Sequence, residues 1–503
     1  MKNRARLLAV DLGASGGKCF AGFFDDSTFS LQEVHRFSHE AVTFHVADRN
    51  GRLEERTVWD DVLLHANIIA GLRAYRRCVG REIDSVGIDA WGADGAFVTE
   101  DGVTLGQTYA YRDHRLDSMI DEVKTRMDAG RVYGITGIHF QPFNVSNQLM
   151  WWMQNRRELV KKGMRFLPIP TLFAYWLGGA SRVDSSWASI TQLMDIRRHA
   201  WSGEILQALG IPDWIMPGIV EPGAIIGEIH APVAEAADVA RARLIAVASH
   251  DTASAFAAAP VADPEGALVV SSGTWSLIGK LIEKPITGPE AMSANISNEG
   301  GIGNTRFLKN CMGMWLVQEL RREWRNRDGR EMGWDEISAL AVKGGSFSAF
   351  IDPDDKSFYN PQSMERAICE FCLKSGQKPP ADRQSTLRVV YESLALKYRT
   401  VAGLISRASG RPNRVVHVVG GGSRNDFLNQ MTADALGLPV TAGPEEATAI
   451  GNAMVQALGL GIISGLPEAL PMIRAAFPIR EFKPKDRGLW ESAHGKFTAL
   501  LKG

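Results

Sequence analysis

The feature that most constrains the fold is a strand-and-turn pattern that occurs twice. Residues 7–18 read as an apolar strand that runs into a turn of Gly, Ala and Ser. Residues 267–279 read as a strand, a Ser/Gly/Thr turn and a second apolar run. A Pro-, Ala- and Asp-rich stretch at 258–265 indicates a break between strands there. We therefore expect two similarly built α/β domains, at 1–245 and 246–503.

Strands and helices alternate after each copy of the pattern. Apolar residues recur at helical spacing in four stretches, and short apolar runs indicate two further strands. The helices are expected at 59–77, 312–325, 385–408 and 425–436, and the strands at 83–89 and 415–419. For the longest helix, Ser385 or Thr386 is the expected N-cap and Gly410 lies just past the end. This alternation is typical of parallel or mixed α/β sheets.

The composition excludes several classes of protein. The 503 residues are 45% hydrophobic and 22% charged, which is typical of a globular chain with roughly two to four domains. With a net charge of −1, the chain has no overall positive potential that would attract nucleic acid or an anionic membrane. No signal-peptide pattern and no run of roughly 18 apolar residues is found. We expect no nucleic acid and no membrane as partners, and a monomer or homodimer.

The cysteines indicate a reducing compartment. There are five, an odd and sparse number, so we expect a cytoplasmic protein. Cys369 and Cys372 form a C-x-x-C pair in the helical-looking stretch 363–375, but no second pair or histidine lies at zinc-ligand spacing. We therefore interpret them as two thiols one turn apart on a helix.

The first turn that could carry chemistry is Asp11-Leu-Gly-Ala-Ser-Gly-Gly-Lys18. Glycine lets the backbone approach a ligand, and successive N–H groups of a tight turn can surround an anion. The spacing is too short for a Walker A loop, and Cys19 stands where Ser or Thr would follow the lysine. The turn predicts a hairpin-type phosphate loop, with Asp11 holding Mg²⁺ directly or through water. An ordinary glycine-rich β-turn is the alternative.

Two later turns could complete a nucleotide site. The turn at 271–276 offers hydroxyl and amide donors, which phosphate oxygens accept. Gly420-Gly-Gly422 lies between a buried strand and a helix, and its lack of side chains permits flat contact with a purine or ribose. The chain has no dinucleotide fingerprint, which disfavours a nicotinamide dehydrogenase. For both turns the alternative is a plain connection between elements.

The candidate catalytic residue is Asp251. Ser249, His250 and Asp251 are consecutive, so their side chains diverge and cannot form a hydrolase triad. A carboxylate at the start of the helix near Thr252 is kept ionised by the helix N-terminus, and it can accept a proton from a bound hydroxyl. Capping this helix is the alternative role.

Polar and aromatic loops could accompany this acid. Three loop-like segments, at 89–94, 111–115 and 141–144, suit a sugar, because rings lie on aromatic side chains and carboxylates or amides bond to hydroxyls. A turn or a satisfied core polar group is the alternative for each. His139 and His250 are expected to be structural rather than metal ligands, since no other ligand is near them in sequence.

Taken together, the motifs resemble those of the FGGY family of carbohydrate kinases, and within it those of its L-rhamnulose kinases. The set is specific, although no single motif is. The motifs occur in order over nearly the whole chain, at 10–17, 83–89, 91–94, 110–113, 136–138, 141–144, 247–255, 271–277, 298–301, 308–310, 313–316 and 419–422.

The resemblance implies an α/β fold of two ribonuclease-H-like domains, as in actin and hexokinase, around a central cleft. The first would bind sugar and carry the first phosphate loop, and the second would carry the catalytic acid, the second phosphate loop and the adenosine site. The implied reaction transfers the γ-phosphoryl group of ATP to the 1-hydroxyl of a 6-deoxyketose, with L-rhamnulose as the expected substrate and Mg²⁺ as the cofactor. Asp251 would be the general base and Asp11 would reach Mg²⁺. The implied ATP site is Ala14, Ser15, Gly16, Gly17, Lys18, Thr274, Gln318, Gly420, Gly421 and Gly422, and the implied sugar site is Gly92, His250, Asp251, Thr252 and Asn310.

The chain departs from the family pattern at three places. Gly92-Ala-Asp-Gly95 stands where the family has Gly-Val-Asp-Phe, Ala90 replaces a Thr, and Lys18 replaces a common Arg. The missing aromatic at Gly95 predicts a wider sugar pocket. L-Fuculose, L-xylulose or another ketose or polyol is therefore an alternative substrate, and a non-catalytic actin-like nucleotide switch is an alternative function.

Overall fold

A computed structural model describes residues 4–47 and 50–501, and the chain divides into two compact units. Unit 1 extends to Ala258 and also contains Ile282–Phe307 and Ala447–Ala476. Unit 2 consists of Ala259–Leu281, Leu308–Glu446 and the chain from Phe477 onward. The sequence predicts contiguous domains at 1–245 and 246–503, whereas in the structure two segments from the later half pack with the earlier one.

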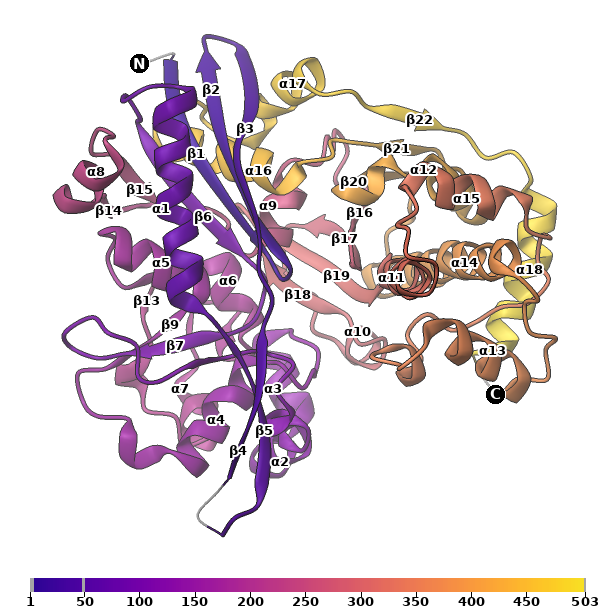
Figure 1. Cartoon of the computed structure of the whole chain (residues 1–503), viewed down its shortest axis with the longest axis horizontal. Coiled ribbons are helices and arrows are strands. Elements are labelled where there is room, and N and C mark those ends of the chain that lie inside the picture. Colours follow the sequence, from indigo (N-terminus) through magenta and orange to yellow (C-terminus); the bar gives the residue numbers. More distant parts are fainter. Residues whose placement is uncertain (1–3, 48–49, 502–503) are drawn as a thin grey trace. The chain divides into compact units, whose positions relative to one another are not determined.

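The main sheet of unit 1 has six strands in the order β14-β15-β6-β1-β2-β3 (Figure 1). β1 (Arg4–Gly13), β2 (Gly16–Asp25) and β3 (Thr28–Ser38) are consecutive antiparallel strands. β6 (Ser85–Ala90) runs parallel to β1, β15 (Arg243–Ile245) runs parallel to β6, and β14 (Ile225–Glu228) is the antiparallel edge strand. The first predicted phosphate loop is therefore the two-residue turn of the β1–β2 hairpin.

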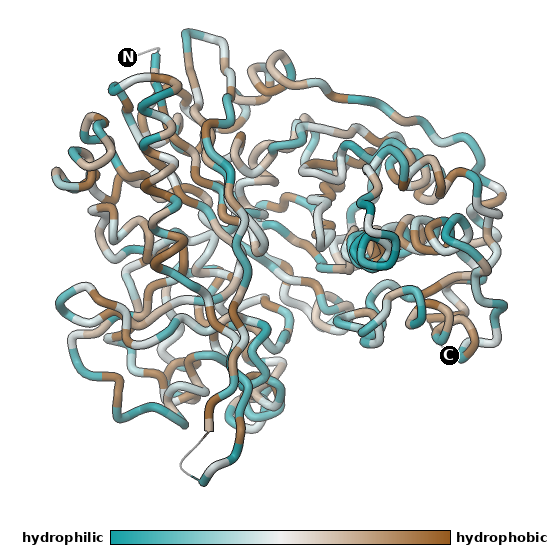
Figure 2. Tube along the Cα trace, viewed as in Figure 1, coloured by the Kyte–Doolittle hydropathy of each residue, from teal (hydrophilic) through white to brown (hydrophobic). Residues whose placement is uncertain are grey.

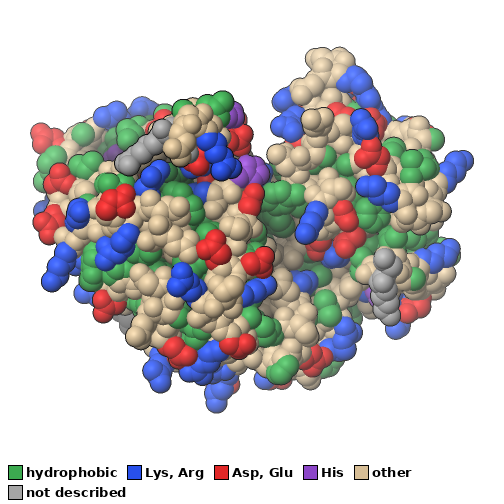
Figure 3. Space-filling view, turned by 90° about the horizontal axis from the view of Figure 1, so that it is seen from below, with side chains coloured by type: hydrophobic (Ala, Val, Ile, Leu, Met, Phe, Trp, Pro, Cys, Tyr) green, Lys and Arg blue, Asp and Glu red, His purple; other side chains and the backbone are tan. Residues whose placement is uncertain are grey.

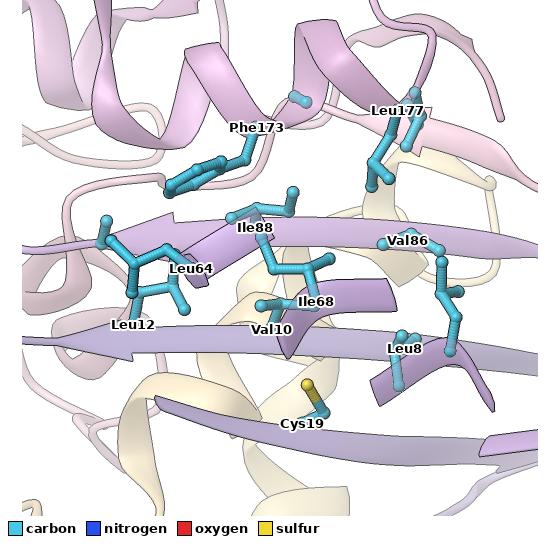
Figure 4. Close-up of a cluster of buried hydrophobic side chains, with 14 of the residues drawn as sticks. Leu8, Val10, Leu12, Cys19, Leu64, Ile68, Val86, Ile88, Phe173 and Leu177 are labelled. Carbon is cyan, nitrogen blue, oxygen red and sulfur yellow. The ribbon is translucent and has the colours of Figure 1, made fainter. Parts of the chain in front are cut away.

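The core of unit 1 lies between this sheet and two helices, α1 (Asp61–Cys78) and α5 (Ile169–Leu177) (Figure 4). Leu8, Val10 and Leu12 lie on one face of β1, because successive strand residues alternate, and they share a buried cluster with Leu64 and Ile68 of α1. Burial of each such side chain contributes about 1.5–3 kcal/mol. Along α1 hydrophobic residues alternate with hydrophilic ones, as a helix with one buried side requires (Figure 2).

The opposite face of the sheet is covered by α16 (Ala447–Gly459), from the later of the two exchanged segments. Ala9 of β1 and Phe20 of β2 pack there against Ala449. The short helix α9 (Asp251–Ala257) packs against α16, and no side chain fits at Gly451 because a Cβ there would meet the backbone of Ser254. The sheet of unit 1 is thus completed by residues from near the end of the chain.

The remainder of unit 1 has a second buried cluster, formed by apolar residues between Phe97 and Met216. The small sheets of unit 1 have the orders β4-β5-β8, β7-β9, β10-β13 and β11-β12. The remaining elements are β4 (Val42–Ala47), β5 (Leu53–Trp59), β7 (Gly95–Val98), β8 (Thr108–Tyr109), α2 (Met119–Arg126), α3 (Ala129–Thr136), α4 (Val145–Asn155), β9 (Arg165–Pro168), β10 (Arg182–Asp184), α6 (Ser185–Ile190), β11 (Met194–Asp195), β12 (Ala200–Trp201), α7 (Gly203–Ala208), β13 (Gly218–Val220), α8 (Ala231–Ala237), α10 (Pro289–Ser293) and α17 (Leu466–Ala476).

The second sheet has seven strands in the order β18-β19-β17-β16-β20-β21-β22 (Figure 1). Its strands are β16 (Ala267–Ser272), β17 (Trp275–Ile282), β18 (Ser297–Gly300), β19 (Thr305–Met312), β20 (Val415–Val419), β21 (Val440–Ala442) and β22 (Arg480–Phe482). β16 and β17 form an antiparallel hairpin, and β20 runs parallel to β16. The order β19-β17-β16-β20-β21 repeats β3-β2-β1-β6-β15, which confirms the expected pair of similarly built domains.

The predicted helices of the later half form with small differences at their ends. They are α11 (Trp315–Asp328), α14 (Arg383–Ser409) and α15 (Asp426–Leu436), accompanied by α12 (Trp334–Lys343), α13 (Met364–Lys374) and α18 (Arg487–Leu500). Gly410 adopts the left-handed conformation just past α14, as expected. The N-cap prediction was wrong: Asp382 caps α14, and its carboxylate accepts a hydrogen bond from the backbone N–H of Ser385 at 2.8 Å.

The two cysteines of the C-x-x-C pair lie on α13, as predicted for thiols on a helix. Burial raises the pKa of Cys372 to about 11 and raises that of Cys369 as well. Thiols with raised pKa values are poor nucleophiles, because the thiolate is the reactive form.

The surface carries charges of both signs. On the face drawn in Figure 3, acidic and basic side chains are intermixed, in keeping with the net charge of −1. Among the residues that the structure describes, no helix has the length and apolar character that crossing a membrane requires.

Candidate active site

Three carboxyl groups lie at the carboxyl ends of β1 and β6, the central strands of the unit 1 sheet. Asp11 and Asp89 lie opposite each other in the parallel register of β1 and β6. Asp251 begins α9, and the segment before it continues the sheet: the backbone N–H of Ala90 donates to the carbonyl of Ser249 at 2.9 Å. The negative charges of Asp11 and Asp251 both contribute to a raised pKa at Asp89. The three acids therefore form one electrostatic group.

Asp89 is a member of this group that sequence reasoning missed. The sequence placed Asp89 at the end of the expected strand 83–89 and at the start of the loop-like segment 89–94, but gave it no role beside Asp11; in the structure it lies within β6 and is fully buried. Its Oδ2 accepts a hydrogen bond from Asn452 of α16 at 2.5 Å, and its Oδ1 has no hydrogen-bond partner among the described residues. Burial first, and then the charge of Asp11, raises the pKa of Asp89 well above its ordinary value. An acid ending an apolar strand was the available signal.

The same end of the sheet has donor groups that fit a divalent cation. Hard cations prefer carboxylate oxygens, and Mg²⁺ is commonly held by one or two carboxylates together with substrate phosphates and water. Asp11 and the unbonded Oδ1 of Asp89 supply such oxygens. Within residues 4–47 and 50–501, no group of three His, Cys, Asp or Glu is arranged for a metal, so other ligands would have to complete the shell.

Asp251 is a partly exposed carboxyl group at a helix N-terminus. It is the first residue of α9, whose N-terminus stabilises a negative charge, and its side chain is 31% exposed. Its Oδ1 accepts hydrogen bonds from the backbone N–H of Thr252 at 2.5 Å and from the Thr252 hydroxyl at 3.0 Å. His250 occupies the N-cap position, and Asp251, the first helical residue, accepts from a backbone N–H of the first turn, so its contact with the helix end is compatible with a catalytic role.

A buried ion pair lies behind His250. Arg306 is fully buried, and its Nη1 lies 3.0 Å from Oε2 of Glu299. Its Nη2 donates to Nδ1 of His250 at 3.2 Å, while Nε2 of His250 lies 3.5 Å from Oδ1 of Asp251. Burial alone would raise the pKa of Glu299, but the charge of Arg306 holds it at about 2. Arg306 was not singled out from the sequence, because pairing across a fold leaves no local pattern.

Gly92 lies against the same histidine. A Cβ at position 92 would come within 2.5 Å of Nε2 of His250 and 2.9 Å of Ile190. Gly92, His250, Asp251 and Thr252, which the resemblance assigns to the sugar, therefore lie together in unit 1.

Asp94 is the centre of an aromatic cluster beside this group. Its Oδ2 accepts hydrogen bonds from the indole N–H groups of Trp59 at 2.7 Å and Trp91 at 3.1 Å, and from the backbone N–H of Tyr111 at 3.0 Å. The rings of Trp59 and Trp91 are 4.5 Å apart between centroids. Asp94 has a φ of 72°, which non-glycine residues seldom adopt. One buried carboxylate thus orients the aromatic side chains at 59, 91 and 111.

This carboxylate should make stability depend on pH. Burial raises the pKa of Asp94 from 3.8 to about 6, so between these values the folded state binds more protons than the unfolded state and stability falls as pH rises. We expect the free energy of unfolding of the wild type, relative to Asp94→Asn, to fall by about 3 kcal/mol between about pH 4 and about pH 6. Asn tolerates the left-handed backbone. Urea unfolding across this range measures the difference, and a flat difference would contradict the prediction.

The expectation of a wider pocket at Gly95 was wrong. Gly95 begins β7 and pairs with Pro168 of β9. A Cβ at this position would lie 2.5 Å from the ring of Phe166 and 2.6 Å from the carbonyl oxygen of Leu167. A neighbouring aromatic from β9 occupies the space that an aromatic at 95 would need, so the missing side chain leaves no opening.

The tip of the first predicted phosphate loop is exposed, and the residues that follow it in β2 are closely packed. Ala14 and Ser15 are exposed between β1 and β2. Gly16 and Gly17 have no room for side chains, because Phe37 of β3 packs directly against both. Lys18 lies opposite Asp11 in the antiparallel register. The five residues predicted to bind phosphates are thus presented at the end of the sheet where the acids lie.

The predicted nucleotide residues of unit 2 also gather at one end of a sheet. The Thr274 hydroxyl, in the β16–β17 turn, donates to Oε1 of Gln318 in α11 at 3.2 Å. Gly420 has a φ of 81°, and Gly421 and Gly422 begin a 3₁₀ turn. Side chains at 420 or 422 would meet Ser272 at the end of β16. Asn310 lies on β19, and its Oδ1 has no hydrogen-bond partner among the described residues.

The repeated sheets and the strand-end loops define a class of protein: α/β phosphotransferases with two ribonuclease-H-like domains, as in actin and hexokinase. Solved structures support this fold. A ligand-bound xylulose kinase from Lactobacillus acidophilus matches with a TM-score of 0.79 over 99% of this chain and 98% of that chain, at 15% identity. Plasmodium falciparum glycerol kinase with ADP matches with a TM-score of 0.76 over 99% and 97%, at 16% identity.

The sequence places the chain within that class. The models of the FGGY family of carbohydrate kinases match at residues 7–257 for the N-terminal domain and 268–460 for the C-terminal domain. The chain belongs to the FGGY family of carbohydrate kinases. It is 37% identical to a rhamnulokinase of Bacteroides thetaiotaomicron over 99% of this chain and 100% of the relative. It is 35% identical to a rhamnulokinase of Bacillus subtilis over 95% of each. The predicted family, fold class and kinase activity are confirmed.

Proposed function

We propose that this kinase transfers the γ-phosphoryl group of ATP to the 1-hydroxyl of L-rhamnulose. The observation that carries the proposal is the position of Asp251, an accessible carboxylate at a helix N-terminus beside two further acids. The similarity to rhamnulokinases over nearly their whole length supports the choice of ketose.

In this proposal Asp251 accepts the proton of the 1-hydroxyl as that oxygen attacks the γ-phosphorus. In phosphoryl transfer the base mainly orients the nucleophile, and most of the catalysis comes from positioning and charge stabilisation. Gly92, His250 and Thr252, which contact one another or Asp251 in unit 1, are proposed to bind the sugar together with Asn310.

The nucleotide would be held by groups on both hairpins. We propose that the turn at Ala14, Ser15, Gly16, Gly17 and Lys18 binds phosphate, and that unit 2 contributes Thr274, Gln318 and the turn at Gly420, Gly421 and Gly422. Asp11, with Asp89 beside it, is proposed to hold Mg²⁺ directly or through water. When bound, this ion would offset the negative charge of the phosphates.

A coupled assay of ADP release over a panel of ketoses and polyols tests the substrate. We expect the highest kcat/KM with L-rhamnulose and a product phosphorylated at C1. L-Fuculose and L-xylulose are the alternatives to include, because they share the ketose head that would carry the reacting hydroxyl. A higher kcat/KM with either of them, or phosphate at another carbon, would contradict the proposal.

Gly92→Ala should weaken sugar use specifically. The new methyl group would displace the imidazole of His250 or Ile190, and overpacking of this kind costs about 1–3 kcal/mol. We expect kcat/KM for the ketose to fall about tenfold while the affinity for ATP is retained. Gly134→Ala in α3 is the matched control, because no atom lies within 4 Å of its added Cβ. Equal losses in the two variants would contradict the assignment of position 92.

A further inference from the structure

We propose that the buried Arg306–Glu299 pair is a positioning device that holds His250 as the tautomer protonated on Nε2. His250 then donates a hydrogen bond on the side where Asp251 lies, and Asp251 alone acts as the base. The catalytic part of this inference rests on the proposed function, whereas the tautomer does not.

The donor and acceptor chemistry of the contacts determines the tautomer. A neutral imidazole has one donor and one acceptor nitrogen, and a guanidinium has only donors. Nη2 of Arg306 is 3.2 Å from Nδ1 of His250, so Nδ1 must accept. The ring proton therefore lies on Nε2, which is 3.5 Å from Oδ1 of Asp251. Oε2 of Glu299 also lies 3.4 Å from Nδ1, but it makes no hydrogen bond with any described residue, whereas the contact with Arg306 meets hydrogen-bond geometry.

The guanidinium of Arg306 makes two hydrogen bonds and one ion pair in unit 1. Its Nε donates to the carbonyl of Gly300 at 2.9 Å, Nη2 donates to His250, and Nη1 faces Glu299 at 3.0 Å. Its plane also lies near the ring of Phe256, 6.0 Å from the centroid. Glu299 lies in β18 and Arg306 lies in β19, and only a short connection separates the two strands, so nearby backbone sets the position of the donor.

Glu299 offsets the energetic cost of burying the Arg306 guanidinium. Arg306 is fully buried and the Glu299 side chain is 4% exposed, and a charge taken out of water needs an opposite charge close by. The carboxylate of Glu299 satisfies that need without occupying Nδ1 of His250. Glu299 thus supports the donor, and Arg306 orients the ring.

This arrangement has a consequence for the chemistry. Nδ1 is covered by Arg306 and Nε2 carries the proton, so neither nitrogen of His250 can take a proton from the hydroxyl. A His250 with the opposite tautomer would offer a lone pair toward Asp251, which would repel the carboxylate and compete for the hydroxyl proton. The pair therefore separates the role of donor from that of base.

The tautomer can be measured on the ligand-free full-length protein. We would label the eleven histidines with ¹⁵N, record two-bond ¹H–¹⁵N correlation spectra, and assign His250 by its loss in His250→Gln. The expected result is an unprotonated Nδ1 and a protonated Nε2 in the wild type. A protonated Nδ1 overturns the proposal.

Variants then test the role of the pair. In the neutral double variant Glu299→Gln/Arg306→Met we expect His250 to lose its Nε2–H preference. We also expect kcat for ketose phosphorylation to fall about tenfold with KM for ATP unchanged, as is usual for partners that orient a histidine. Arg306→Lys keeps a buried cation with only donor groups, which disfavours a proton on Nδ1, so we expect this variant to retain the tautomer. A double variant with wild-type tautomer and kcat contradicts the proposal, and so does an Arg306→Lys variant that folds but shows the opposite tautomer.

The two proposals fail in distinguishable ways. If the wild type phosphorylates no ketose but His250 is protonated on Nε2, the substrate assignment fails and the positioning role stands. If the wild type phosphorylates L-rhamnulose but His250 is protonated on Nδ1, the substrate assignment stands and the positioning role fails. Should the double variant not fold, the wild-type and Arg306→Lys spectra still decide the tautomer.

Discussion

Asp251→Asn is expected to lower kcat for ketose phosphorylation by about 10²–10⁴-fold, the usual contribution of a positioned general base. The amide keeps the shape of the side chain and can still accept from Thr252, but it cannot accept the hydroxyl proton. Nucleotide binding should persist, because the groups proposed to bind ATP lie on the two hairpins, on α11 and in the turn after β20, and not on α9. Coupled ADP release gives kcat, and calorimetric titration gives the affinity for ATP.

A second acid in the first turn of a helix provides the control. Asp121→Asn removes a carboxylate from the first turn of α2, an exposed position in unit 1, and should leave kcat unchanged. If Asp251→Asn phosphorylates the ketose at the wild-type rate, the assignment of the base is wrong. If it loses ATP affinity as well, the residue has a structural role in the nucleotide site.

Arg306→Met is expected to lower the free energy of unfolding by about 3–5 kcal/mol, because it leaves a buried carboxylate without its partner. The charge of Arg306 holds the pKa of Glu299 at about 2, so removing the arginine forces this acid to take up a proton or to remain charged in the interior. Equilibrium unfolding in urea at neutral pH measures the change.

Two further variants separate burial from charge. The double variant Glu299→Gln/Arg306→Met should recover a large part of the lost stability, because no unpaired charge remains. The ion pair of Arg131 with Glu204 has a similar N–O distance, 2.7 Å, but its side chains are 60% and 49% exposed. Arg131→Met should therefore leave stability almost unchanged. A single variant Arg306→Met as stable as the double variant would contradict this account.

The elements with a local pattern could be predicted from the sequence. Both hairpins follow from apolar runs that meet small-residue turns, and α14 and α15 follow from helical spacing and from the glycines that end them. Asp251 was found because an acid follows an apolar run. The N-cap of α14 was missed because Asp382 lies before the apolar pattern that was used to place the helix start.

The residues that sequence reasoning missed depend on contacts between distant segments. Asp89 joins the acids only because β6 lies beside β1 in one register, and Arg306 meets His250 across 56 positions of chain. The reading of Gly95 failed for the same reason, since the ring that fills its space belongs to Phe166 on another strand. A single sequence identifies each residue but does not show which distant residues it contacts in the fold.

The contribution of α16 to unit 1 has a consequence for biosynthesis. Asn452 bonds to Asp89 across 363 positions, and Gln456 bonds to Ser85 and to the carbonyl of Leu8 across 371 and 448 positions. A growing polypeptide therefore lacks these partners until residues 452 and 456 have left the ribosome. The acid-bearing sheet can be completed only after that point, and until then its uncovered apolar face is exposed to aggregation or to binding by chaperones.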